Sequence, residues 1–196
     1  TATQERLFVP FAQGDSWYTA GYTRPSLGSF AYAAGLMHES GHNLGLKHGH
    51  VEQAGHGVMF PTLSFDHNSY EYSVMTYVQY PGASTEFGDN APDHPTTFMQ
   101  DDIAALQYLY GPSPSARAGD DTYAIDSQGP NFIWDGGGVD TLTAAACTEG
   151  CTLYLTPGYW GYVGLAPAQQ ITAAGQVTVN FGSTIENLVG SDHDDA

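Results

Sequence analysis

The sequence predicts an α+β fold in which two helices are followed by a series of short strands. Apolar side chains recur at helical spacing in residues 29–43 and 101–110. After residues 112–116, which are rich in proline and serine, short β-type runs alternate with turns. We therefore expect one domain over residues 1–112 and a β-rich domain over residues 113–196.

Each element has its own local signals. The first helix is expected to begin at Ser29, a residue type that caps helix N-termini, and to stop before Gly45, because glycine accepts the positive φ of helix ends. The second follows Asp101 and Asp102, whose carboxylates favour a helix N-terminus. Residues 47–98 carry loop signals without helical period. The expected strands are residues 7–9, 122–125, 131–134, 152–155 and 176–181.

The charge balance excludes two classes of partner. Four Lys plus Arg face 21 Asp plus Glu, which gives a formal charge of −17. Phosphate backbones and anionic lipid heads bind basic surfaces, and four cations cannot form one. No apolar run approaches the ~20 residues of a membrane span. We therefore expect neither nucleic acid nor a membrane as a partner.

Two further features of the composition each leave two interpretations open. The carboxylates cluster in glycine-rich stretches, which suits a hard cation such as calcium or, alternatively, an acidic surface that keeps the protein soluble. Cys147 and Cys151 are too few for a disulfide scaffold. We expect them to form a local disulfide or to remain free thiols, and not to bind zinc.

Residues 38–48 read H-E-S-G-H-N-L-G-L-K-H, which fits the pattern H-E-x-x-H-x-x-G-x-x-H. On a helix, His38 and His42 lie four residues apart and project from one face. The following glycine allows the chain to turn and to bring His48 to the same ion. Three neutral imidazoles leave zinc an open position for water, and Glu39 is placed beside it as a base.

A second motif agrees with the first. Residues 73–77 read S-V-M-T-Y, and with the histidine pattern the chain resembles the serralysin branch of the metzincins, secreted bacterial zinc metalloproteases that carry a calcium-binding RTX β-roll. The resemblance implies that Met75 forms an apolar floor beneath the histidines. It also implies that Tyr77 contacts zinc and moves aside to stabilise the oxyanion. Residues 101–111 resemble the helix that closes the family's protease domain.

The resemblance extends to calcium-binding stretches in residues 117–121, 134–141 and 183–187. Glycines there free the backbone so that carbonyls and carboxylates can converge on one ion. For a first calcium it implies these ligands: Arg117 and Gly119 through their carbonyls, and Asp121, Asp135, Gly137 and Asp140. For a second it implies Gly138, Asp140, Thr184 and Glu186. Residues 188–195 resemble the onset of a glycine-aspartate repeat, which forms a stable roll only when several copies stack.

The function implied by this resemblance is hydrolysis of peptide bonds in extracellular proteins and peptides by a secreted zinc endopeptidase. Two alternatives remain: a fragment that binds zinc and calcium without activity, and a calcium-dependent adhesion or binding module.

The chain also departs from the family. The segment before His38 is shorter than in serralysins, so part of the catalytic domain is expected to be missing or to come from a second polypeptide. Gly49 replaces a proline and Ser40 an apolar residue, but neither change removes a ligand. The remaining loop histidines are expected to be solvated: His50, His56, His67 and His94.

Overall fold

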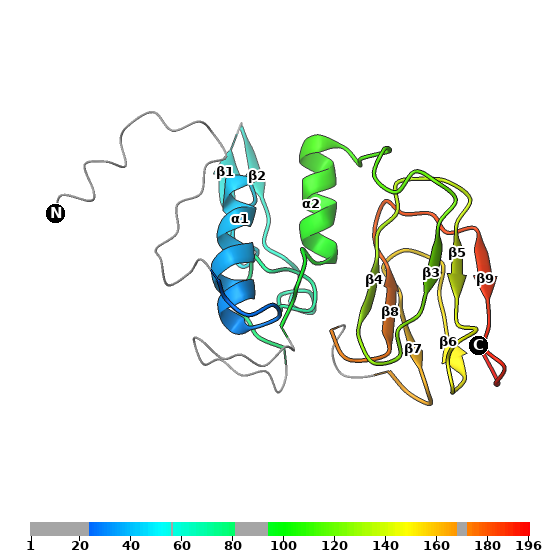
Figure 1. Cartoon of the computed structure of the whole chain (residues 1–196). Helices are drawn as coiled ribbons and strands as arrows, with labels where there is room; N and C mark the ends of the chain where they lie inside the picture. The colour runs from blue at the N-terminus through cyan, green and yellow to red at the C-terminus, as the bar shows by residue number, and fades with distance from the viewer. Residues whose placement is uncertain (1–23, 56, 81–93, 168–171) are drawn as a thin grey trace.

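The computed structural model describes residues 24–55, 57–80, 94–167 and 172–196, which contain helices together with several small sheets (Figure 1). The chain therefore combines helical and β elements, as the sequence predicts. The strand expected at residues 7–9 lies outside the described residues. None of the described helices is both long and apolar enough to cross a membrane.

Both predicted helices are present. A π-helical stretch, Ala31–Met37, leads directly into α1, His38–Asn43, and α2 spans Gln100–Tyr110. Gly45 ends the first helical region with a φ of 91°, a left-handed conformation that favours glycine. The chain then folds back, and the Leu46 amide donates a hydrogen bond of 2.9 Å to the Gly41 carbonyl.

The strands are short and outnumber those predicted. Their bounds are β1 Gln53–Gly55, β2 Val58–Phe60, β3 Thr122–Ala124, β4 Asn131–Ile133, β5 Thr141–Thr143, β6 Cys151–Thr152, β7 Trp160–Val163, β8 Gln176–Val179 and β9 Asn187–Val189. The antiparallel hairpin of β1 and β2 lies where the sequence indicates only loops. Strands of three or four residues show little alternation, so the sequence predicts β3, β4 and β8 but does not reveal β1, β2, β5, β7 and β9.

The C-terminal strands form two sheets around a common core. One sheet has the order β3-β5-β9, with parallel pairing throughout. The other has the order β4-β8-β7-β6, in which only β4 and β8 are parallel. Buried side chains from both sheets meet in one cluster, which includes Ile133 of β4, Leu142 of β5 and Val179 of β8.

Helix α2 lies between the hairpin and these sheets (Figure 1). On the α1 side, Leu46, Val74, Met75 and Met99 form a second buried cluster, against which Phe132 and Trp160 of the β-rich part pack. The Gln107 side chain of α2 also donates a hydrogen bond of 2.8 Å to the Phe181 carbonyl. The two parts on either side of residues 112–116 therefore contact each other, and the predicted domain boundary there stays a prediction.

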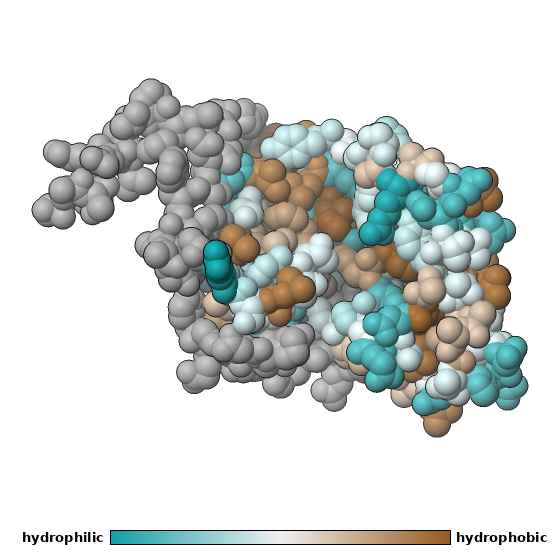
Figure 2. All heavy atoms as spheres, viewed as in Figure 1, coloured by the Kyte–Doolittle hydropathy of each residue, from teal (hydrophilic) through white to brown (hydrophobic). Residues whose placement is uncertain are grey.

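Hydropathy differs across the surface shown in Figure 2. Hydrophobic side chains gather over the region of α1, the hairpin and α2, whereas hydrophilic ones are more frequent over the β-rich part. Exposed hydrophobic residues in the first region include Met59 of β2 and Tyr108, Leu109 and Tyr110 at the end of α2.

Candidate metal centre

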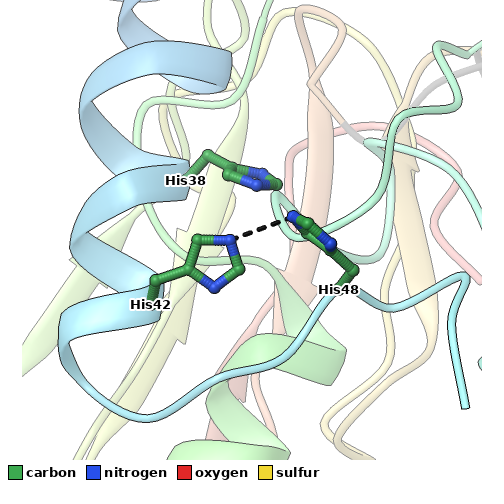
Figure 3. A group of neighbouring side chains, drawn as sticks. All are labelled: His38, His42 and His48. Atoms are coloured by element: carbon green, nitrogen blue, oxygen red, sulfur yellow. Dashed lines mark hydrogen bonds between the residues drawn. The ribbon is translucent and has the colours of Figure 1, made fainter. Parts of the chain in front are cut away.

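Three histidines converge at the C-terminal end of α1. His38 and His42 project from the helix, and the turn at Gly45 brings His48 back toward them (Figure 3). Each offers a ring nitrogen, and these three nitrogens lie within 4.8 Å of one another. The Nε2 atoms of His42 and His48 are 3.0 Å apart. The structure thus brings together the three residues that the sequence predicts as ligands.

Backbone carbonyls fix two of the rings. His38 Nδ1 lies 2.7 Å from the Val74 carbonyl oxygen, and His42 Nδ1 lies 2.9 Å from the Leu46 carbonyl oxygen. A carbonyl oxygen only accepts hydrogen bonds, so both Nδ1 atoms carry the proton in the neutral ring. Each Nε2 atom is left with a lone pair directed at the centre, which is how metal-binding histidines are usually oriented.

Burial favours the neutral form of His38 and His48. Desolvation lowers the pKa of His38, and the nearby His42 ring adds to this effect, although the Val74 carbonyl opposes it. Desolvation also lowers the pKa of His48, again together with the neighbouring histidines. Neutral imidazole is the form that binds a metal. The Nε2 atoms of His42 and His48 lie 3.0 Å apart, and the lone pair of His42 Nε2 is free to bind an ion. This arrangement of nitrogen ligands fits a divalent cation.

Glu39 follows the first histidine on α1 and is exposed. Its carboxylate raises the pKa of His38 and His48, although burial outweighs this effect. This position suits a base that works on solvent beside a metal ion.

Met75 and Tyr77 both lie at the centre. Met75 is 2% exposed and packs under α1, where its sulfur occupies the space that a methyl group on Gly41 would need. The Tyr77 hydroxyl lies 2.8 Å from His48 Nε2, and its ring stacks on that of His38 with centroids 5.4 Å apart. The structure therefore places Tyr77 beside the three histidines.

A buried carboxylate holds the chain segment that precedes Met75. Asp102, 2% exposed in the first turn of α2, accepts hydrogen bonds from the Ser73 hydroxyl (2.6 Å), the Val74 amide (2.8 Å) and the Met99 amide (3.0 Å). Burial raises the pKa of Asp102 to about 6, although the three donors oppose the shift. Because Val74 also accepts the bond from His38, Asp102 supports the centre indirectly, a role that its position at a helix N-terminus does not reveal.

Two of the histidines predicted to be solvated have partners or are buried instead. His94 is 1% exposed and packs edge-to-face against Phe30, so the expectation of a solvated ring is wrong there. His67 pairs with Asp101 at 2.9 Å and stacks on Tyr72. His50 is half-buried beside His48, and His56 lies outside the described residues. The sequence carries no signal for the contacts of His94 with Phe30 and of His67 with Asp101, because these partners are remote along the chain.

A second group of potential ligands lies in the β-rich part. Carboxylate oxygens of Asp121, Asp135 and Asp140 lie within 4.8 Å of one another, and the last two residues are fully buried. Asp140 Oδ2 is buried without a hydrogen-bond partner among the described residues. The hydrogen bond from the Asp121 amide lowers the pKa of Asp140. Burial and the nearby Asp135 carboxylate act in the opposite direction, and the net effect is a raised pKa. Such a group fits a cation that offsets the repulsion.

Of the other predicted calcium ligands, some contact the aspartate group and others do not. Glu186 accepts a hydrogen bond of 2.7 Å from the Asp140 amide, and the Gly119 carbonyl lies against Gly138. Gly137 donates to Asp135 at 2.6 Å, whereas Thr184 is exposed. Arg117 has a φ of 50°, and its guanidinium donates to the Trp134 carbonyl at 3.2 Å.

The cysteines also have a definite state here. Cys147 and Cys151 are both buried free thiols. Burial raises the pKa of the Cys151 thiol to about 12, with the adjacent Cys147 side chain adding to the shift. Of the two alternatives left open by the sequence, the structure has free thiols.

Comparison with known proteins gives no matching family model but several curated relatives. The chain is 32% identical to Metallopeptidase AprA of Pseudomonas marginalis over 90% of its own length and 40% of that protein. It is 29% identical to Serralysin C of Dickeya chrysanthemi, covering 93% of the chain and 40% of the relative. Serralysin of Proteus mirabilis is 29% identical over 90% of the chain and 38% of that protein.

The chain therefore spans about two fifths of the length of these curated relatives. The similarity confirms the resemblance inferred from the histidine and methionine motifs. Over about nine tenths of its length, this chain is a relative of the serralysin-type metalloproteases.

Proposed function

We propose that the chain carries the catalytic centre of a secreted zinc endopeptidase that hydrolyses peptide bonds in extracellular proteins. The observation that carries the proposal is the convergence of three imidazoles, two of which have their outer nitrogens held by backbone carbonyls. Three neutral imidazoles with an open fourth position are characteristic of catalytic zinc. The similarity to serralysins supports the same reaction and a metzincin fold.

Each residue of the centre then has a role. His38, His42 and His48 hold zinc, which supplies Lewis acidity that polarises the scissile carbonyl and makes water more acidic. Glu39 takes the proton from the attacking water and passes it to the leaving amine. The Tyr77 hydroxyl donates a hydrogen bond to the oxyanion, and Met75 is the apolar floor under the rings.

Calcium is the second cofactor of this proposal. Asp121, Asp135 and Asp140 form the main ligand group, completed by nearby backbone carbonyls and Glu186. The parallel pairing of β3, β5 and β9 beside it is compatible with the start of an RTX β-roll. Substrates are proteins or peptides.

Glu39→Gln tests the mechanism because it removes the base while leaving all three histidines. We expect the zinc content to be unchanged and hydrolysis of a fluorogenic peptide to fall by at least about 100-fold. Glu52→Gln, which alters another exposed glutamate, serves as the matched control and should keep full activity.

Other outcomes would favour the alternatives. Full activity in Glu39→Gln would discard the mechanism. A zinc-loaded wild type that hydrolyses nothing would favour a metal-binding protein without activity. Calcium without zinc in elemental analysis of the purified protein would favour an adhesion or binding module.

A further inference from the structure

The His50 ring lies beside the candidate metal centre, although His50 is not one of the three converging histidines. Its ring lies 4.6 Å from the Tyr77 ring between centroids, at an angle of 43°, and stacks on His48 with centroids 5.3 Å apart at 22°. These separations are within the range of favourable aromatic pairs. His50 is thus part of the ring cluster around Tyr77, although it is not among the converging ligands.

The backbone fixes this arrangement. The Gly49 amide donates a hydrogen bond of 2.8 Å to the Met75 carbonyl, and the Leu63 amide donates one of 2.8 Å to the Gly49 carbonyl. A side chain at Gly49 would also come within 2.6 Å of Leu63 Cδ1. The residue between His48 and His50 is therefore held on both sides, and both histidine rings lie against Tyr77.

The position of the Tyr77 side chain depends on these ring contacts because most of the side chain faces solvent. Its side chain is 63% exposed, and its hydroxyl makes one hydrogen bond in the described structure, to His48 Nε2. That nitrogen is also a candidate metal donor, so it is not available to the phenol when a metal is bound. The rings of His38 and His48 are likewise committed to the centre. His50 is the ring in contact with Tyr77 that has no ligand duty among the described residues.

Packing, and not hydrogen bonding, holds His50 there. Its Nδ1 atom is buried and has no hydrogen-bond partner among the described residues. A buried polar atom without a partner is unfavourable, so the aromatic contacts of the ring must offset that cost.

We propose that His50 is a positioning residue whose ring holds the Tyr77 phenol over the three-histidine centre. The proposal rests on the proposed function of this centre. A single aromatic contact changes the equilibrium between held and released tyrosine by about 2- to 10-fold. His50 therefore acts on how often Tyr77 is in place, not on metal binding itself.

The first test uses the metal-free protein with isotope-labelled tyrosine. Tyr77→Phe identifies the Tyr77 ring signals, which the surrounding histidine rings displace from those of free tyrosine. His50→Ala should move them toward free tyrosine, whereas His50→Phe, which keeps a ring, should preserve the displacement. Unchanged Tyr77 signals in His50→Ala would overturn the proposal. If His50→Ala fails to fold, His50→Gln removes the ring but keeps a polar side chain.

The second test separates this proposal from the proposed function. In the copper(II)-loaded protein, a phenolate-to-copper absorption band reports Tyr77 at the metal, and Tyr77→Phe should abolish it. His50→Ala should weaken the band and lower kcat by about 2- to 10-fold with KM unchanged, and His50→Phe should restore both.

The outcomes point to different failures. A band that is lost in Tyr77→Phe but equal in wild type and His50→Ala would overturn the role of His50. No band in copper-loaded wild type would contradict the proposed role of Tyr77 at the metal, and the ring signals of the metal-free protein would still decide whether His50 positions it.

Discussion

Gly41 is a residue of α1 that packs directly against the rest of the fold. It is buried, and the sulfur of Met75, itself 2% exposed, fills the space beside it. Alanine normally stabilises a helix interior by about 1 kcal/mol relative to glycine. Here the added methyl group would displace the buried Met75 side chain, and we expect this overpacking to outweigh that gain.

We therefore expect Gly41→Ala to lower the free energy of unfolding by about 1–2 kcal/mol in urea denaturation. Met75→Ala makes room for the added methyl, so in the double variant Gly41→Ala should be neutral or stabilising. Additive losses in the double variant would show that Gly41 is not packed against Met75 in this way.

At the scale of single residues, the sequence predicts which histidines converge but not the groups that support them. His38 and His42 can be placed because four residues along a helix return to one face. The acceptor of His38 is the Val74 carbonyl, far along the chain, and every residue carries a carbonyl, so no pattern marks it. His50 is missed for a related reason: its stacking depends on backbone pairing between Gly49 and Met75.

Helix α2 shows how one element supports another. Its position follows from Asp101, Asp102 and the apolar spacing after them, and the observed bounds agree with that prediction. Its first turn, however, also accepts the Ser73 hydroxyl and the Val74 amide through Asp102. The sequence cannot show that a carboxylate suited to a helix N-terminus is also buried against a distant loop.

Asp102→Ala should destabilise the protein by about 3 kcal/mol or more, because three donors lose their acceptor in a buried site. Asp102→Asn keeps one acceptor oxygen for the two amides and should cost about 1 kcal/mol. Asp101→Ala is the matched control: it breaks only the partly exposed pair with His67 and should cost no more than about 1 kcal/mol. Chemical denaturation measures all three, and equal losses for both alanine variants would contradict the assigned role.

Across the whole molecule, carboxylates outnumber cationic side chains, and the carboxylates of Asp121, Asp135 and Asp140 meet in the β-rich part. That part contacts the α1 region through α2 and through Trp160, which stacks on Tyr72 at 5.4 Å. The sequence predicts two parts but not this contact. Tyr72 and Trp160 are far apart along the chain, and no local pattern shows that their rings stack.

Calcium should therefore stabilise the chain as a whole. Adding calcium to chelator-treated protein is expected to raise the free energy of unfolding by about 2.7 kcal/mol at 100-fold excess over Kd, and Tm by roughly 5–10 °C. Asp135→Asn should abolish this response while leaving the response to zinc, and the fluorescence of Trp160 should follow the same transition. A Tm that is indifferent to calcium would contradict the proposed site.

The use of main-chain oxygens to orient His38 and His42 has a consequence for the tolerance of the centre to mutation. No substitution can delete the acceptors at Val74 and Leu46, since any amino acid placed there brings its own carbonyl. In a saturation mutagenesis screen, the histidines should tolerate no replacement, whereas Leu46 and Val74 should accept other apolar residues that fit the buried cluster and preserve the path of the chain.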